Sequence, residues 1–147
     1  MTTHAESRVL PYAADLMYAI VSDVEKYPEF LPWCAALRVL SKERVKDRDV
    51  LRAEMLVGFG ALRERYTSRV VLDAAAHTVD AAQTDGPFRQ LESRWRFTPQ
   101  SEGCRVDFSV TFEFKNRLLD TVAGKAFEQV LLKITDAFET RARALSD

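Results

Sequence analysis

Hydrophobic and polar side chains alternate through most of residues 37–114, and beyond residue 118 hydrophobic side chains recur at every third or fourth position. The first pattern is typical of half-buried β-strands, and the second is typical of an amphipathic helix. The alternation predicts strands over 37–46, 50–59, 62–72, 78–83, 91–98 and 104–114. The later pattern predicts one helix over 118–144, which is about 40 Å long at ~1.5 Å per residue. Its apolar face is predicted from Leu119, Val122, Ala126, Val130, Ile134 and Phe138.

Shorter elements precede this run of strands. Residues 4–10 are mixed in polarity and end at Pro11, which is typical of an edge strand. Residues 13–24 are predicted to be helical, and the stretch KYPEFLPW over 26–33 predicts a short helical turn. This order predicts an α+β fold, with a curved antiparallel sheet of about seven strands around the C-terminal helix and a meander as the simplest topology. We expect a single domain over residues 1–147.

The composition is that of a folded, water-soluble domain. The 147 residues carry a net charge of −1, and 47% are hydrophobic and 29% charged, which excludes disorder as the main state. The uncharged apolar stretches are shorter than the ~20 residues that span a bilayer. The first ten residues do not resemble a signal peptide, so we expect a cytoplasmic protein. Cys34 and Cys104 lie outside any CxxC pair and are expected to be reduced, structural thiols.

One face of the predicted sheet is apolar and rich in aromatic side chains. Alternation assigns to this inner face Leu51, Ala53, Met55, Val57, Phe59, Tyr66, Ser68, Val70, Leu72, Leu91, Ser93, Trp95, Phe97, Val106, Phe108, Val110, Phe112 and Phe114. Two interpretations remain open. The aromatic side chains can fill the core completely, or a single helix across a curved sheet can leave an apolar cavity of a few hundred Å³.

The opposite, outer face is predicted to carry seven arginines and three carboxylates. Its residues are Arg52, Glu54, Arg63, Arg65, Thr67, Arg69, Glu92, Arg94, Arg96, Arg105, Asp107, Ser109 and Thr111. Two interpretations are open here as well. The charges can form cross-strand ion pairs on a solvated face, or the excess of arginine can be a contact surface for the phosphates of RNA or of anionic lipids.

The sequence contains no nucleophile, phosphate-loop or metal-binding motif, so we expect neither an enzyme nor a metal site. His4 is expected near a frayed terminus and His77 in a turn over 74–78, both on the surface. Tyr66, Ser68 and Ser93 are the polar groups of the inner face; they can orient a ligand carbonyl or hydroxyl, or bond to backbone.

The segment 85–91 contains a Gly-Pro turn followed by Phe88. One interpretation is a hairpin with an aromatic anchor. The other is a mobile apolar lip at the mouth of a cavity, which could touch a membrane.

Several stretches together resemble a known family. They are YAIVSDV over 18–24, YPEFLPWC over 27–34, YTSRV over 66–70, GPF over 86–88, and then Leu91 and WRF over 95–97. They resemble the START-like helix-grip superfamily and, within it, the coenzyme Q-binding protein family of polyketide-cyclase-like domains. The resemblance covers about residues 4–144, and it is fairly specific because the YPxFxPWC and GPF elements occur together.

The resemblance implies a non-enzymatic lipid-binding domain that carries or chaperones ubiquinone in support of respiratory electron transfer. The ligand would lie in a tunnel between the sheet and the C-terminal helix, with no covalent cofactor. Burial of an isoprenoid tail is favourable at ~25 cal/mol per Å², and one or two donors such as Tyr66 or Ser68 would orient the quinone ring. The residues predicted to line the tunnel are Phe30, Trp33, Met55, Val57, Phe59, Tyr66, Ser68, Phe88, Leu91, Trp95, Phe108, Val110, Phe112, Val122, Ala126 and Val130.

The same family includes bacterial proteins similar to a ribosome-association toxin, which implies an alternative function. A ribosome-binding regulator of translation would use the arginine-rich outer face, although a net charge of −1 is unusual for an RNA binder. An aromatase/cyclase would need more polar groups in the pocket. Quinone delivery would also require transient contact with the inner membrane, expected through Phe88 and the loop near Phe59. We expect no DNA partner.

Overall fold

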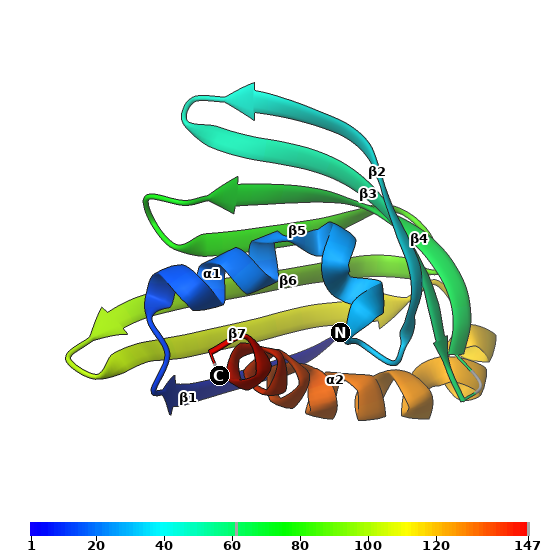
Figure 1. The fold of residues 1–147 in the computed structure, drawn as a ribbon. Helices are drawn as coiled ribbons and strands as arrows, with labels where there is room; N and C mark the ends of the chain where they lie inside the picture. Colours follow the sequence, from blue (N-terminus) through cyan, green and yellow to red (C-terminus); the bar gives the residue numbers. More distant parts are fainter. Residues whose placement is uncertain (61, 147) are drawn as a thin grey trace.

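The computed structural model describes residues 1–60 and 62–146. Seven strands form one sheet, and two α-helices and one short 3-10 helix lie on its concave side (Figure 1). In chain order the elements are β1 (Thr2–Leu10), α1 (Ala14–Ser22), η1 (Val24–Glu29), β2 (Cys34–Val45), β3 (Arg48–Phe59), β4 (Leu62–Asp73), β5 (Thr78–Asp85), β6 (Phe88–Gln100), β7 (Gly103–Phe114) and α2 (Arg117–Ser146).

The sheet confirms the predicted antiparallel architecture. Its strand order is β1-β7-β6-β5-β4-β3-β2, so β2 to β7 form a meander and β1 is an edge strand beside β7. The predicted strands are right in number and order but too short at several ends. The pairing of β2 with β3 shifts register twice, between Cys34 and Ala36 and between Val39 and Ser41. Such bulges interrupt the strict alternation by which the start of a strand is recognised.

The helix α2 lies along the concave side of the sheet, and the sheet curves around it (Figure 1). Its 30 residues bury a stripe made by Ala123, Phe127, Val130, Leu131, Thr135, Phe138 and Ala142. The prediction that Val122 faces the sheet is wrong, because 54% of its surface is exposed. Positions 122 and 123 both follow 119 at helical spacing, and each step of one residue turns the helix by about 100°. The hydrophobic pattern favours the larger side chain, Val122, but the smaller Ala123 is the one that packs inward.

An aromatic cluster closes the core near the first turns of α2. It consists of Phe88, Phe112, Phe114 and Phe127. Phe88 lies 4.6 Å from Phe114 and 5.0 Å from Phe127 between ring centroids, and only 3% of its surface is exposed. The interpretation of Phe88 as a mobile lip is therefore wrong. The side chain of Gln83 holds this turn, since its Nε2 donates to the Phe88 carbonyl at 2.7 Å and its Oε1 accepts from the Phe88 amide at 3.1 Å.

Gly86 makes that turn sterically feasible. Its φ is +155°, and a Cβ at this position would lie 2.5 Å from the Cβ of Tyr66. Only glycine fits so close an approach. The GPF element thus directs Phe88 into the core rather than towards solvent.

Candidate functional site

An apolar cavity of about 170 Å³ lies between the sheet and α2. Nearly all the elements of the fold contribute to its wall. The lining residues are Val24, Tyr27, Leu31, Trp33, Leu37, Ala53, Met55, Val57, Tyr66, Ser68, Val70, Val79, Ala81, Leu91, Ser93, Trp95, Phe108, Val110, Phe127, Val130, Leu131, Ile134 and Phe138. Both of the chain's tryptophans are among them. The core is therefore not completely filled, although the space is smaller than the few hundred Å³ expected from the sequence.

The structure brings most of the predicted tunnel residues to this wall. Trp33, Met55, Val57, Tyr66, Ser68, Leu91, Trp95, Phe108, Val110 and Val130 line the cavity. Phe30, Phe59, Phe88, Phe112, Val122 and Ala126 do not.

Each of these six has another environment. Phe88 and Phe112 belong to the aromatic cluster, and Phe30 packs on Phe138 with ring centroids 5.3 Å apart. The ammonium of Lys133 lies 5.0 Å from the Phe59 ring centroid. The Ala126 Cβ lies 3.8 Å from the position that a Cβ on Gly60 would take, and Val122 is exposed.

Several lining residues were not predicted as site residues. Val79 and Ala81 lie two positions apart along β5 with a polar residue between them, which is the pattern of a strand with one buried face. The segment 78–83 is too short and too polar for that pattern to show which of its faces is buried. Tyr27 and Leu31 come from the irregular stretch 26–33, where no period identifies the buried side chains. Phe127 and Leu131 follow from the one-residue rotation of α2 described above.

The polar groups of the cavity are two tyrosines and two serines, Tyr27, Tyr66, Ser68 and Ser93. The Tyr27 hydroxyl donates to the Val21 carbonyl, so it is already satisfied. Among residues 1–60 and 62–146, the Tyr66 hydroxyl has only the Sδ of Met55 as its acceptor, at 3.5 Å, and a thioether is a weak acceptor. The Tyr66 hydroxyl is thus a donor that a ligand oxygen could engage.

Burial keeps the acidic groups around the cavity protonated. It raises the pKa of Tyr66 to about 12, with a smaller contribution from Cys34, and it raises the pKa of the Cys34 thiol to about 11. Both cysteines are free and buried. At neutral pH the Tyr66 and Cys34 groups are therefore both protonated, and the Tyr66 hydroxyl keeps the proton that it can donate.

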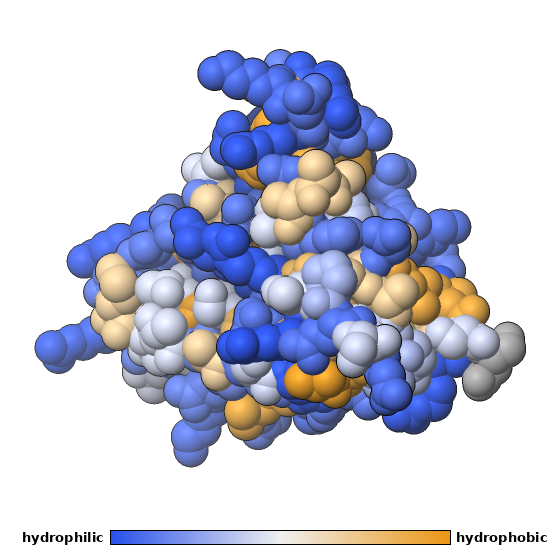
Figure 2. All heavy atoms as spheres, turned by 90° about the vertical axis from the view of Figure 1, so that its left-hand side faces the viewer, coloured by the Kyte–Doolittle hydropathy of each residue, from blue (hydrophilic) through white to orange (hydrophobic). Residues whose placement is uncertain are grey.

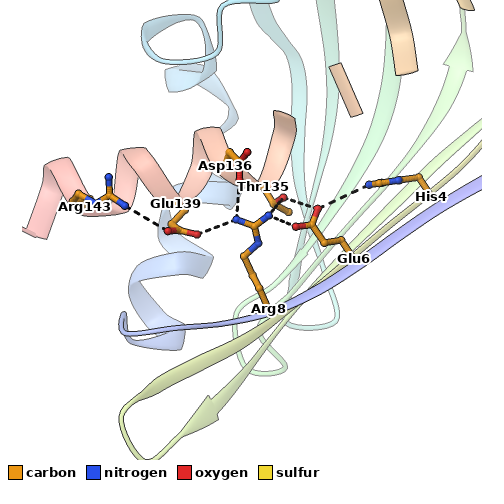
Figure 3. A network of polar contacts seen from close by, with 7 residues as sticks. All are labelled: His4, Glu6, Arg8, Thr135, Asp136, Glu139 and Arg143. Carbon is orange, nitrogen blue, oxygen red and sulfur yellow. Dashed lines mark hydrogen bonds and ion pairs between the residues drawn. The ribbon is translucent and has the colours of Figure 1, made fainter. Parts of the chain in front are cut away.

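A polar network joins the edge strand β1 to α2 beside the cavity (Figure 3). The Arg8 guanidinium donates to Asp136 Oδ1, Glu139 Oε1 and Thr135 Oγ1, each at 2.9 Å, and it also contacts Glu6. The Thr135 hydroxyl donates to Glu6 Oε2 at 2.7 Å. Glu6 is paired in register with Phe108, a cavity residue. These contacts hold α2 against β1 at one side of the cavity.

The environments of the two histidines differ from the prediction. The terminus is not frayed at His4, because β1 starts at Thr2 and pairs with β7, and His4 is three-quarters buried beside Phe108. The His77 ring is 20% exposed, and its Nε2 lies 2.6 Å from Asp15 Oδ1. Each histidine was assigned to the surface because local sequence does not reveal these long-range contacts. Within residues 1–60 and 62–146, no three His, Cys, Asp or Glu side chains are grouped to hold a metal ion.

A second, more open hollow of about 390 Å³ lies over β1, β6 and β7. It is lined by Ala5, Glu6, Ser7, Arg94, Arg96, Asp107, Phe108 and Ser109. Asp107 lies 3.2 Å from Arg105, and Arg94 lies 4.0 Å from Asp80. In this region the outer face therefore carries ion pairs, as one of the two interpretations of its charges predicts. We take the smaller cavity as the candidate site because it is apolar and holds the weakly bonded Tyr66 hydroxyl.

Residues 10–139 match the family model described as polyketide cyclase/dehydrase and lipid transport. The chain belongs to this family. Its sheet and long C-terminal helix are the helix-grip fold of the START-like superfamily, as the resemblance implied. The solution structure of protein CC1736 from Caulobacter crescentus is 36% identical, with a TM-score of 0.82 and 99% of each chain covered. The Zhui aromatase/cyclase of a Streptomyces species, at 16% identity and the same TM-score of 0.82, shares the fold alone.

Two kinds of sequence relative are found within the family. The ribosome association toxin RatA of Pseudomonas aeruginosa is 37% identical over 147 residues, which is 99% of both chains. The mitochondrial coenzyme Q-binding protein COQ10 homolog B of Xenopus laevis is 40% identical over 144 residues, which is 95% of this chain and 57% of that protein. These relatives are named for binding and regulation rather than for a reaction, whereas some fold neighbours are cyclases.

Proposed function

We propose that the chain binds an isoprenoid quinone of the ubiquinone class in the cavity between the sheet and α2. The observation that carries the proposal is an apolar cavity in which the Tyr66 hydroxyl, weakly bonded to the Met55 sulfur, can donate to a carbonyl. A quinone ring is flat and apolar, and its oxygens only accept hydrogen bonds. The name of the Xenopus relative, a coenzyme Q-binding protein, supports this ligand class.

The volume limits how the ligand fits. An apolar cavity of about 150 Å³ holds one benzene molecule, so about 170 Å³ holds a quinone ring with small substituents. An isoprenoid tail needs more room, and its burial contributes ~0.8 kcal/mol for each CH₂ group. The proposal therefore places the ring in the cavity, and it requires the cavity to widen along α2 when a tailed quinone binds.

Tryptophan fluorescence tests the proposal directly, because Trp33 and Trp95 both line the cavity. A short-chain ubiquinone is expected to quench this fluorescence saturably. Val110→Phe, which fills the cavity, is expected to abolish the effect. Val71→Phe makes the same change on the other face of the sheet, and it is the matched control. Equal quenching of the two variants would contradict the proposal.

Delivery of a quinone requires contact with a bilayer, and we place that contact at the start of α2. Leu118 and Val122 are 72% and 54% exposed there, beside the exposed cations Lys115, Arg117 and Lys125. The opposite end of the molecule, which carries the β2–β3, β4–β5 and β6–β7 hairpins, is mostly hydrophilic with small separate apolar patches (Figure 2). Among the described residues, no helix is long and apolar enough to span a bilayer.

Vesicle sedimentation tests this contact. Leu118→Asp with Val122→Asp is expected to reduce co-sedimentation with vesicles that contain phosphatidylglycerol. Leu132→Asp removes an apolar side chain that is 64% exposed farther along α2, and it is the control. Unchanged sedimentation of the double variant would place the contact elsewhere.

The second candidate function is association with a ribosomal subunit. It is favoured by the Pseudomonas relative RatA, whose match extends over 99% of both chains. Sedimentation of the purified protein with ribosomal subunits through a sucrose gradient tests it. Protein that stays at the top of the gradient would contradict this candidate.

A further inference from the structure

Four arginines form a cluster on the convex outer face of the sheet. Arg52 comes from β3, and Arg63, Arg65 and Arg69 come from β4; all four are exposed. They alternate with residues that face the cavity side, such as Ala53 and Tyr66. This β3–β4 arginine cluster therefore points away from the cavity.

The arrangement of the cluster is unfavourable for folding alone. Arg52 is directly opposite Arg69 in the pairing of β3 with β4, and like charges in that position destabilise a sheet. Some other arginines of the sheet are paired: Arg48 lies 3.2 Å from Asp73, and Arg38 lies 3.3 Å from Glu54. Within residues 1–60 and 62–146, no carboxylate lies within ion-pair distance of the four clustered guanidiniums.

Two carboxylates near the cluster in register are engaged with other arginines. Glu54 is opposite Thr67 but pairs with Arg38. Asp80 is opposite Val71 but faces Arg94 at 4.0 Å. A third, the exposed Asp85, is opposite Thr67 in β5, and in the described residues it forms no ion pair with the four guanidiniums. The cluster thus places four exposed guanidiniums without ion-pair partners in the described residues on a chain whose net charge is −1, and such an excess of one sign suits an anionic partner.

We infer that the β3–β4 arginine cluster binds the phosphate backbone of RNA. Guanidinium groups bind phosphate oxygens in pairs of parallel hydrogen bonds, and Arg63 and Arg65 are spaced about 6.7 Å along an extended strand. A bilayer-binding face combines cations with protruding apolar side chains. The exposed large apolar residues of the described chain are Met1, Val9, Val45, Leu118, Val122, Leu132 and Leu145, and none of them is on β3 or β4.

This inference deepens the ribosomal candidate and does not depend on the quinone cavity. The test is fluorescence anisotropy of a labelled RNA hairpin between about 50 and 200 mM salt. Four phosphate contacts predict a slope of about −3 in a plot of the logarithm of the association constant against the logarithm of the salt concentration. Over this range of salt the affinity would fall roughly 60-fold.

The decisive variant is Arg52→Gln with Arg69→Gln. It is expected to lower affinity at least about tenfold at low salt and to reduce the slope by about 1.5. Arg48→Gln with Arg105→Gln removes the same charge from ion-paired positions, and its affinity is expected to stay within about twofold of the original. Because the decisive variant relieves the opposed charges, its Tm is expected to hold or to rise by about 1–2 °C.

Two outcomes would overturn the inference. They are equal loss of RNA binding in both double variants, and loss of vesicle binding in place of RNA binding. If the original protein co-sediments with ribosomal subunits and the Arg52/Arg69 variant does so equally, the inference fails while the ribosomal candidate stands. If the original protein binds neither RNA nor subunits, both fail.

Discussion

Replacement of Tyr66 by phenylalanine separates ligand binding from folding in this protein. The Tyr66 hydroxyl contributes little to the unliganded fold, since its acceptor in the part of the chain that the structure describes is the Met55 sulfur at 3.5 Å. We therefore expect the free energy of unfolding to change by less than about 1 kcal/mol. If the same hydroxyl donates to a quinone carbonyl, its loss costs ~0.5–1.5 kcal/mol of binding, which is about a 2- to 12-fold increase in Kd.

The assay is a quenching titration of Trp33 and Trp95 with 1,4-naphthoquinone, and naphthalene is the control ligand without carbonyl groups. Naphthalene is expected to bind the Tyr66→Phe variant as well as it binds the original protein, because the ring burial is unchanged. Urea unfolding measures the stability of both proteins. Equal naphthoquinone affinity in the two proteins would refute the role of the Tyr66 hydroxyl, and so would an equal loss of affinity for naphthalene.

The remaining predictions concern the fastening of α2 and the aromatic cluster. Arg8→Ala is expected to lower the free energy of unfolding by about 1–2 kcal/mol in urea denaturation, because Thr135 is buried and loses a donor; unchanged stability would contradict the role of the network. Burial raises the pKa of Glu6, but hydrogen bonds from Thr135 and Arg8 outweigh it, so the pKa is lowered on folding. This stabilisation is present above the ordinary glutamate pKa and is lost as the pH falls. The free energy of unfolding is therefore expected to decrease between about pH 5 and pH 3, and to decrease less in the Glu6→Gln variant. Phe88→Ala is expected to cost about 3–5 kcal/mol by calorimetry, and a loss below 1 kcal/mol would mean that the ring is not part of the core.

The sheet could be predicted well because its two faces have opposite environments. Along β7, each of Val106, Phe108, Val110 and Phe112 is buried and the residues between them are not, so a period of two is unambiguous. The same reasoning placed Val57, Tyr66 and Trp95 on the cavity side, where the structure has them.

The contacts that depend on distant partners could not be predicted. His4, Glu6 and Arg8 face inward on β1, yet their sequence is typical of a polar edge. Their contacts come from distant positions, since Glu6 and Arg8 bond to α2 and the His4 ring packs beside Phe108 of β7. Phe88 follows a turn typical of a solvent-exposed loop. The close approach of Gly86 to Tyr66 and the hydrogen bonds with Gln83 direct it into the core. The cavity volume itself depends on how side chains pack, which periodicity does not encode.

Native mass spectrometry with lipid extraction, on protein purified from its own source, tests the quinone proposal most directly. We expect one quinone per chain, released on denaturation and lost in Val110→Phe but retained in Val71→Phe. A chain that is empty when purified and that also takes up no added quinone would contradict it.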